Sequence, residues 1–255
     1  MIMHNITTGK VKCQICGSET ALLDVVDFNK SCEEARGKYL PISGIPIYYT
    51  HCPNCSFTFA PEFGQWTEDD FLKRIYNERY IDVDPDYLEV RPRTNAEVIS
   101  NFFSQQKGMI KHLDYGGGNG KLSALLKEKG WDSLSYDPFP RNDIDINELG
   151  KFNFITALEV FEHVPDVNRL MNNLCMLMDN SCLILFSTMT TDGNIRQNNR
   201  ITWWYASPRN GHISLFSKKS LMILGNKYGL GFKSISNGVH CYVNQTPVWA
   251  RNLIN

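Results

Sequence analysis

Glycine recurs in the stretch Asp114-Tyr-Gly-Gly-Gly-Asn-Gly120, immediately after an apolar segment. A backbone without side chains can approach a nucleotide-like ligand closely, so the pattern indicates an enzyme that binds one, although glycine clusters also form plain turns. A dinucleotide fingerprint counted from Gly116 and Gly118 needs its third glycine at position 121, where the chain has Lys121. The third glycine is Gly120 instead, and this spacing disfavours a nicotinamide-dependent reductase.

Acidic residues follow two further apolar segments. Asp137 ends the segment 133–137 and lies 21 positions after Gly116 (137 minus 116). A carboxylate at the carboxyl end of a neighbouring strand can accept both ribose hydroxyls of a nucleoside. An aspartate that only opens a turn at Pro138 is the alternative, and both can hold at once. Glu159 directly follows the apolar segment 152–158.

The elements that position these residues alternate between strands and helices. Strands are predicted at 109–113, 133–137, 152–158 and 182–188, and helices at 121–129, from about 165, and at 218–228. The glycines therefore lie between a strand and a helix. Residues 65–76 begin with Thr67 as a cap and an acidic first turn, and then carry apolar residues on one face, which predicts another helix.

The glycine loop, Asp137, the turn Glu159-Val-Phe-Glu-His163 and the segment His212-Ile-Ser-Leu-Phe-Ser217 occur in an order that resembles class I S-adenosylmethionine-dependent methyltransferases of the ubiquinone-methylase type. The resemblance covers residues 94–255. It implies an α/β fold with a Rossmann-like, mostly parallel seven-stranded sheet flanked by helices. Only 14 residues (138–151) separate Asp137 from the next strand, so the third strand and its helix are expected to be abbreviated.

S-adenosylmethionine is the cofactor that this resemblance implies. The residues expected to hold its methionine part are Asp114, Gly116, Gly118 and Gly120; those expected near its ribose are Asp137 and Pro138; Glu159 would line the pocket.

Two further parts of the cofactor site are less specific. Asp143 and Asp145 are the local candidates for contact with adenine. In related methyltransferases the lead-in to the core folds over the cofactor, which makes Tyr80 and Arg93 candidates for that cover. Packing or pairing at the domain junction is the alternative for both.

Four cysteines form two C-x2-C pairs, Cys13 with Cys16 and Cys52 with Cys55, with 35 residues (17–51) between the pairs. Two such pairs supply four thiolates for a tetrahedral zinc site, and a closed site of this kind is structural. We predict a small zinc ribbon with one structural zinc. A redox dithiol would need one pair only, and packed core cysteines are the remaining alternative. His51 is expected to be a bystander.

Zinc knuckles before such a core resemble zinc-binding methyltransferase families of bacterial sugar and surface-glycan pathways. The predicted organisation is a zinc ribbon (1–62), a helical junction and cofactor cover (63–93), and the methyltransferase domain (94–255). The analogy favours methyl transfer to an oxygen of a small-molecule acceptor: a nucleotide sugar, a surface-glycan precursor or a phosphorylated metabolite.

A sugar hydroxyl is a weak nucleophile and benefits from a general base, for which histidine is the usual residue. His163 follows the strand 152–158 at its carboxyl end, where ligands bind in open α/β sheets. His212 closes the long segment after the strand 182–188. We favour His212 as the base and His163 as a cofactor-side or reserve residue. Either could instead bond a neighbouring loop.

Residues 190–216 form a connection too long to be routine, so we expect the acceptor to bind there. Stacking on a sugar or base is the role expected for the aromatics Trp203, Trp204 and Tyr205, and grip on a phosphate is the role expected for Arg200 and Arg209. The aromatics could equally bury the loop against the core.

Composition limits the partners. The chain has a net charge of −1 and no apolar run of membrane-spanning length, so we expect a cytoplasmic protein without membrane insertion. Ribosomal RNA methyltransferases can carry a similar zinc module, but residues 1–62 hold five lysines and arginines against six acids, which disfavours nucleic acid. A non-catalytic scaffold is disfavoured by the intact set of glycine loop, Asp137 and Glu159. The sequence leaves the oligomeric state open.

Overall fold

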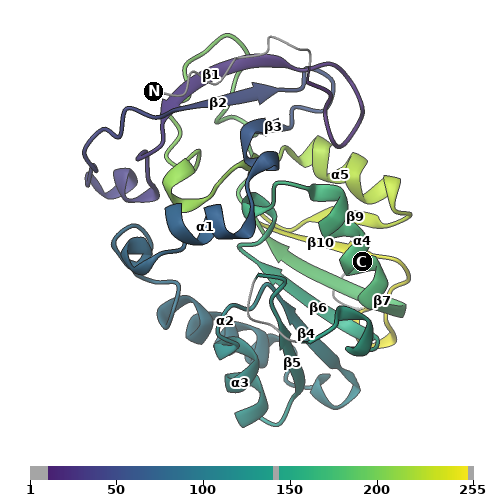
Figure 1. Ribbon diagram of the computed structural model, residues 1–255. Coiled ribbons are helices and arrows are strands. Elements are labelled where there is room, and N and C mark those ends of the chain that lie inside the picture. Colours follow the sequence, from purple (N-terminus) through teal and green to yellow (C-terminus); the bar gives the residue numbers. More distant parts are fainter. Residues whose placement is uncertain (1–10, 140–143, 252–255) are drawn as a thin grey trace.

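The computed structural model describes residues 11–139 and 144–251. Its larger sheet has the strand order β5-β4-β6-β7-β10-β9 (Figure 1). The first four strands pair in parallel, and β10 and β9 are antiparallel to their neighbours. In chain order the strands are β4 (Lys111–Tyr115), β5 (Asp132–Tyr136), β6 (Phe152–Leu158), β7 (Met178–Ser187), β9 (Gly231–Ser234) and β10 (Val239–Val243).

This sheet contains six strands in the part of the chain that the structure describes, so the prediction of seven was wrong. β5 forms one edge. Between β5 and β6 the described residues form only the 3-10 helix Ile146–Glu148. A further strand with its return helix needs more residues than separate β5 from β6. Within the described residues, the third strand and its helix are therefore missing altogether rather than shortened.

Helices cover both faces of the larger sheet, because alternate strand residues point to opposite faces. On one face Ile155 of β6 and Ile184 of β7 pack with α4 (Val167–Leu177) and α5 (Lys218–Lys227). On the other face Phe154 and Leu183 pack with α2 (Val90–Phe102) and α3 (Lys121–Glu128). The predicted helices after the glycine loop, from about 165 and at 218–228 are confirmed.

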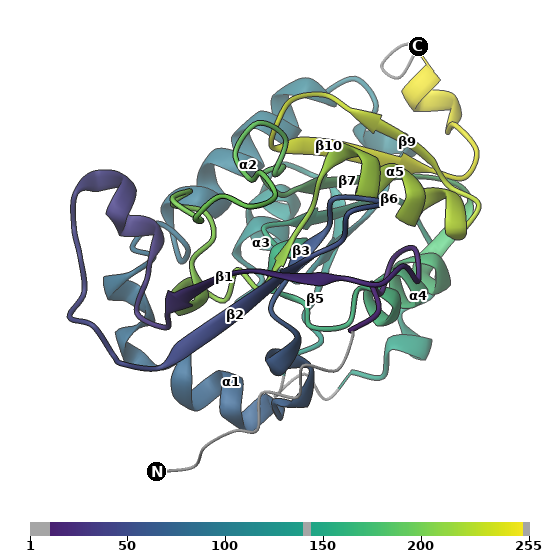
Figure 2. The ribbon, with the colours of Figure 1, turned by 90° about the horizontal axis from the view of Figure 1, so that it is seen from above.

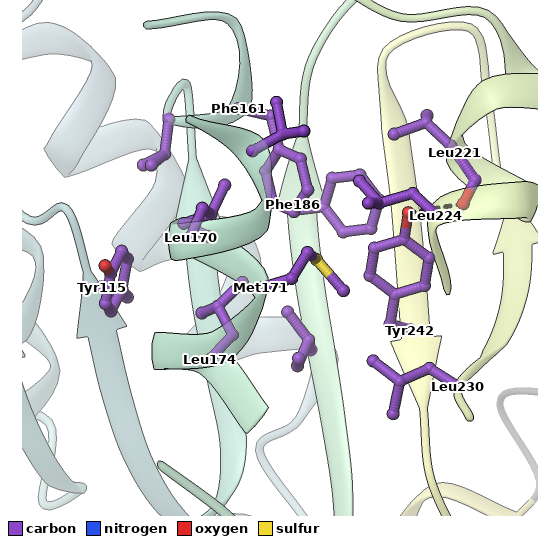
Figure 3. Close-up of a cluster of buried hydrophobic side chains, with 14 of the residues drawn as sticks. Tyr115, Phe161, Leu170, Met171, Leu174, Phe186, Leu221, Leu224, Leu230 and Tyr242 are labelled. Atoms are coloured by element: carbon purple, nitrogen blue, oxygen red, sulfur yellow. Dashed lines mark hydrogen bonds between the residues drawn. The ribbon is translucent and has the colours of Figure 1, made fainter. Parts of the chain in front are cut away.

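The first of these faces is packed with large apolar side chains (Figure 3). Phe161 and Phe186 stack with their ring centroids 4.2 Å apart, and Phe186 stacks on Tyr242 at 4.8 Å. The buried Tyr242 hydroxyl donates to the Leu221 carbonyl at 2.6 Å, which satisfies its only donor. This core fixes the carboxyl ends of β6 and β7 relative to α4 and α5.

A second sheet of four strands, in the order β1-β2-β3-β8, lies above the larger one in Figure 1. All its pairs are antiparallel, and Figure 2 shows β1 and β2 from above. Its strands are β1 (Ala21–Asp27), β2 (Pro46–His51), β3 (Thr58–Phe59) and β8 (Ser214–Leu215). β8 comes from the long connection after β7, so residues far apart in sequence complete this sheet together.

The junction between the two sheets is helical. α1 (Glu68–Arg74) begins at Thr67, whose side chain accepts from the Asp70 amide while Asp70 accepts from Thr67, so the predicted cap is confirmed. The 3-10 helices are Cys32–Arg36, Pro61–Gln65, Glu78–Asp82, Lys107–Met109, Ile146–Glu148, Phe161–His163, Pro208–Asn210 and Val248–Ala250. Within residues 11–139 and 144–251, every helix is too short or too polar to cross a membrane.

Candidate functional site

The glycine loop joins β4 to α3. Gly116, Gly118 and Gly120 have φ angles of 74°, 56° and 76°, a left-handed conformation that side chains disfavour. A Cβ atom on Gly116 would lie 2.5 Å from Val160 Cγ2. A Cβ atom on Gly117 would lie 2.3 Å from Ser135 Oγ. Residue 117 must therefore be glycine because Ser135 lies so close to it. The spacing of the motif did not predict this requirement.

Gly117→Ala is expected to weaken the binding of S-adenosylhomocysteine at least about tenfold and to cost about 1–3 kcal/mol of stability. The new methyl group would also lie 2.5 Å from Asp114 Oδ2, so the loop must shift. Gly64→Ala is a matched control, since its Cβ atom would meet nothing within 4 Å. Calorimetric titration and thermal unfolding of both variants measure the effect; equal affinities would contradict it.

Asp137 directly follows β5 and holds the glycine loop. Its Oδ2 accepts from the Gly118 amide at 2.8 Å, and its Oδ1 accepts from the Phe139 amide at 2.9 Å. The second bond is the Asp-Pro turn that the sequence offered as an alternative. The first bond ties the Asp137 carboxylate to the glycine loop.

Asp114 is buried at the end of β4, where its Oδ1 accepts from the Thr156 hydroxyl at 2.9 Å. Burial, opposed by the Thr156 hydrogen bond and helped by the negative charge of Asp137, raises the pKa of this carboxyl to about 7. A carboxyl this buried is half protonated near neutral pH.

Without cofactor, Asp114→Asn is therefore expected to be more stable than the wild type, by a difference that grows as pH rises. The folded pKa of about 7 exceeds the unfolded value near 3.9, so the wild type loses stability as pH rises between these values, and the penalty is complete above pH 7. The variant avoids this penalty, which is of the order of 2–4 kcal/mol. Urea unfolding at pH 5 and pH 8 tests it; a difference between variant and wild type that does not grow with pH would contradict it.

Glu159 stands at the end of β6 with a φ angle of 55°, which is unusual for a residue other than glycine. Ser187 holds it from β7: the Glu159 amide donates to Ser187 Oγ at 2.8 Å, and that hydroxyl donates to Glu159 Oε1 at 2.9 Å. Arg91 Nη1 lies 3.7 Å from Glu159 Oε2 and also pairs with Asp84. Contacts from Ser187 of β7 and Arg91 of α2 therefore orient the Glu159 carboxylate.

Neither of the two predicted cover residues, Tyr80 and Arg93, contacts Glu159 with its polar group. Arg93 pairs with Glu89 at 2.9 Å on the surface of α2. The buried Tyr80 hydroxyl lies 3.3 Å from the Asn210 carbonyl. The arginine that reaches the acid is Arg91, two residues earlier. Sequence reasoning missed Arg91 because both arginines fit the same local pattern.

The two predicted histidines meet although 49 positions separate them (212 minus 163), with ring centroids 4.9 Å apart. His212 Nδ1 lies 2.8 Å from the Tyr205 carbonyl. A carbonyl only accepts, so Nδ1 carries the proton and Nε2 keeps its lone pair. Burial lowers the pKa of His212 to about 4 and holds the pKa of His163 well below its usual range. Both rings are neutral at physiological pH.

Neighbouring groups orient the second histidine. His163 Nδ1 lies 3.1 Å from the Tyr76 hydroxyl, which comes from the helical junction. Gly211 lies beside this contact: a Cβ atom there would lie 2.9 Å from the Tyr76 oxygen and 3.0 Å from His163 Nδ1. A side chain at residue 211 would therefore disturb the contact between Tyr76 and His163.

Glu162 completes this group and was not predicted as a site residue. It is fully buried, and its Oε1 accepts from the Tyr205 hydroxyl at 2.6 Å. Its Oε2 lacks a hydrogen-bond partner, as does the hydroxyl of Thr188, the residue directly after β7. Burial and the negative charge of Glu159 together raise the pKa of Glu162 to about 8.

A family model described as a methyltransferase domain matches residues 87–232, more than half of the 255-residue chain. The chain belongs to this methyltransferase family. It is an S-adenosylmethionine-dependent enzyme, which decides against a non-catalytic scaffold and a nicotinamide-dependent reductase. No protein with a curated description matches the sequence.

Among solved structures, the chain is similar to several methyltransferases at low sequence identity. A plantazolicin methyltransferase bound to S-adenosylhomocysteine has a TM-score of 0.46 and 11% identity, covering 73% of this chain and 94% of that one. The 1,6-didemethyltoxoflavin-N1-methyltransferase of Burkholderia thailandensis has a TM-score of 0.49 and 14% identity, covering 82% and 99%. Magnesium protoporphyrin IX methyltransferase of Synechocystis PCC 6803 has 0.39 and 14%, covering 72% and 93%.

The long connection of this methyltransferase packs against the N-terminal sheet. Trp203 and Tyr205 are buried in a cluster with Ile47, Tyr49 and other residues of that sheet, and Trp204 is half-buried beside them. This is the alternative in which the aromatics bury the loop. The Tyr205 hydroxyl, however, reaches Glu162, so one of the three also faces the histidine pair.

The structure does not bring the two predicted phosphate-binding arginines together. Arg200 is exposed and pairs with Asp24 of β1 at 2.8 Å. Arg209 is buried and donates through Nη1 to the Ile75 carbonyl at 3.0 Å. It lines a cavity of about 410 Å³ with Arg74 and Arg79, at the junction rather than at the glycine loop.

Residues predicted near adenine and ribose are placed less fully. Asp143 lies outside the described residues. Asp145 accepts from the Asn147 amide at 3.0 Å and begins the 3-10 helix before β6. Pro138 is half-buried beside Asp137.

The four predicted cysteine ligands of the methyltransferase converge, with all four sulfurs within 4.8 Å of one another. The Cys13–Cys55 and Cys16–Cys52 sulfurs are 3.5 Å apart, too far for disulfides. Zinc–sulfur bonds of about 2.3 Å require sulfurs about 3.8 Å apart, so the donor set fits zinc. His51 instead hydrogen-bonds Thr58 at 2.8 Å through Nδ1.

The two knuckles have matching turns and contact two different helices of the core, α4 and α5. The Gly17 amide donates to Cys13, and the Ser56 amide donates to Cys52, both residues having positive φ. The first knuckle reaches α4, where the Val167 amide donates to the Gln14 side chain at 3.2 Å. The second reaches α5, where the Ser217 hydroxyl donates to the Cys55 carbonyl at 2.6 Å. The cysteine cluster thereby joins the N-terminal sheet to the core.

Proposed function

We propose that this enzyme transfers the methyl group of S-adenosylmethionine to an oxygen of a small polar acceptor: a nucleotide sugar, a surface-glycan precursor or a phosphorylated metabolite. Bound S-adenosylmethionine supplies an electrophilic methyl group on a positively charged sulfur. The choice of oxygen as the acceptor atom rests on the tautomer of His212, which donates its Nδ1 proton to the Tyr205 carbonyl at 2.8 Å. Nε2 can then accept a proton from a hydroxyl group.

The cofactor would be held by residues at the ends of three parallel strands. Asp114, the glycines Gly116, Gly118 and Gly120, Asp137 with Pro138, and Glu159 are proposed to bind it, with Tyr80 and Arg93 as cover. In favour of this assignment, open α/β sheets bind ligands at the carboxyl ends of their strands. Arg91 joins the set, since it lies between Asp84 and Glu159.

Methyl transfer is an in-line displacement that needs the nucleophile aligned and desolvated. As the acceptor oxygen forms its bond to the methyl carbon, the carbon–sulfur bond breaks and its electron pair stays on sulfur. His212 takes the hydroxyl proton at Nε2. His163, held by Tyr76, is proposed to orient the cofactor or the acceptor beside it. Stacking by Trp203, Trp204 and Tyr205 and phosphate binding by Arg200 and Arg209 remain proposals for the acceptor.

The cysteine cluster is proposed to hold one structural zinc. Cys13, Cys16, Cys52 and Cys55 would fill all four positions of a tetrahedral ion, which leaves none for a substrate. In this proposal the metal maintains the N-terminal sheet, and this sheet in turn supports the acceptor site through Tyr49, whose hydroxyl donates to the His212 carbonyl at 2.6 Å.

His212→Gln is expected to lower turnover about 100-fold or more while S-adenosylhomocysteine binding stays within about threefold of the wild type, because general-base catalysis contributes about 10²–10⁴. The assay follows S-adenosylhomocysteine release with panels of nucleotide sugars and sugar phosphates. His240→Gln is the control, a buried β10 histidine whose Nε2 bonds the Thr188 carbonyl. Turnover near the wild-type rate in His212→Gln would remove the base assignment.

A further inference from the structure

Glu162, His163 and His212 are the second cluster of potential metal ligands in the described chain, separate from the four cysteines. One ligand atom of each residue lies within 4.8 Å of the other two. We propose that these three side chains bind a divalent transition-metal ion that holds the acceptor oxygen. The proposal rests on the proposed methyl transfer to an acceptor oxygen, but it gives His212 a different role there, that of a metal ligand.

The donor set matches a known coordination preference. Two imidazoles and one carboxylate on adjoining elements form a facial triad, which leaves other coordination positions open for a substrate. Ligands about 2.0–2.2 Å from a metal lie about 3–4 Å from one another, so small side-chain rotations close this set. Imidazole favours zinc, iron, nickel or copper, and the carboxylate also admits manganese.

The carboxylate has an oxygen with no other function in the fold. Glu162 is fully buried, yet its Oε2 has no hydrogen-bond partner. Among the described residues no lysine or arginine pairs with it, since Arg91 is engaged by Asp84 and Glu159. A buried carboxylate is normally neutralised by a partner or a metal. Without such a partner the buried carboxyl holds a proton, and a cation bound at Oε2 would displace it.

Each ligand also has the outer contact that metal ligands usually have. A metal-binding histidine typically donates its other ring N–H to a carbonyl or hydroxyl, which fixes the ring and its tautomer. His212 donates from Nδ1 to the Tyr205 carbonyl, and His163 Nδ1 lies 3.1 Å from the Tyr76 hydroxyl. Tyr205 also donates its hydroxyl to Glu162 Oε1 at 2.6 Å. One tyrosine therefore orients two of the three proposed ligands.

A metal at this position changes the role of His212. As a ligand it cannot also take the proton directly; the cation would instead lower the pKa of a bound hydroxyl group, as divalent metals do for water, and the proton would leave to solvent. The two roles make different demands on metal binding, so the proposed function and this proposal can fail separately.

The test is a titration of the zinc-loaded protein with Mn²⁺, followed by loss of the free-ion electron paramagnetic resonance signal and by calorimetry. Four thiolates disfavour Mn²⁺, so the cysteine cluster does not compete for it. The wild type is expected to bind one equivalent at micromolar concentration. Glu162→Gln and His212→Ala should each weaken binding at least 100-fold, and Tyr205→Phe about tenfold.

Two controls keep the result interpretable. His240→Ala removes a buried histidine outside the cluster and should bind Mn²⁺ like the wild type. Unchanged S-adenosylhomocysteine affinity shows that each variant is folded. The absence of Mn²⁺ and Zn²⁺ binding beyond the one zinc of the cysteine cluster would overturn the proposal, as would equal affinity in Glu162→Gln and His212→Ala. If His212→Gln loses turnover and the wild type binds no metal beyond the zinc of the cysteine cluster, the assignment of His212 as the base would still stand.

Discussion

Asp137→Ala is expected to lower the affinity for S-adenosylhomocysteine at least about 100-fold. The carboxylate is proposed to accept ribose hydroxyls, and charge-assisted hydrogen bonds of this type contribute about 1.5–3 kcal/mol each, so their loss exceeds 2.8 kcal/mol, about two factors of ten. The variant also frees the Gly118 amide, which donates to Asp137 at 2.8 Å and helps to fix the glycine loop. Both effects act in the same direction.

Calorimetric titration of the zinc-loaded protein measures this loss, with NADH as a parallel ligand. Asp27→Ala is a matched control, because its carboxylate also accepts backbone amides, those of Asn29, Ser43 and Gly44, but in the N-terminal sheet. Asp137→Asn separates charge from shape. An affinity in Asp137→Ala within about threefold of the wild type, or a preference for NADH, would mean that the ribose assignment is wrong.

Cys52→Ser is expected to abolish zinc binding and to lower the melting temperature by about 10 °C or more. Structural zinc contributes binding free energy directly to folding, and a difference of 1 kcal/mol shifts the melting temperature of a chain this long by about 2–4 °C. Cys175→Ser makes the same chemical change at a half-buried α4 residue outside the cluster and should retain zinc. Metal analysis and thermal unfolding of both variants test this.

The same variant is expected to separate methyl transfer from cofactor binding. β3 pairs with β8 two residues after His212, and Tyr49 of β2 donates to the His212 carbonyl, so loss of the zinc site should displace this histidine. The glycine loop belongs to the other sheet. Turnover should therefore fall much further than S-adenosylhomocysteine affinity. A Cys52→Ser protein with wild-type turnover and melting temperature would argue against a structural zinc.

Local sequence pattern was sufficient to predict the elements that carry the proposed cofactor site. The apolar segment, the glycines and the helical spacing after them led to β4, the loop and α3 without tertiary information. The count of strands was wrong because the family pattern was applied to a chain with too few residues between β5 and β6. For the number of strands, the length of the segment between β5 and β6 is a better guide than the resemblance to the family.

The acceptor region could be predicted only in part. His163 and His212 were chosen by their positions after strands, and their rings do meet. Glu162 was passed over because a charged residue in a turn resembles a solvent-exposed one in the sequence, although this side chain is fully buried. The aromatics of the long connection could not be assigned to core or ligand without knowing that the N-terminal sheet covers them.

The sequence by itself determined the methyltransferase core, the order of its elements and the two cysteine pairs, because these depend on residues close together in the chain. The tertiary structure alone decided that β8 completes the N-terminal sheet, that Arg91 rather than Arg93 reaches Glu159, and that Tyr205 links Glu162 to His212. The physical reason is that hydrogen bonds and ion pairs require atoms within about 3–4 Å, and side chains from distant segments reach that range only when the packed core fixes the strands that carry them.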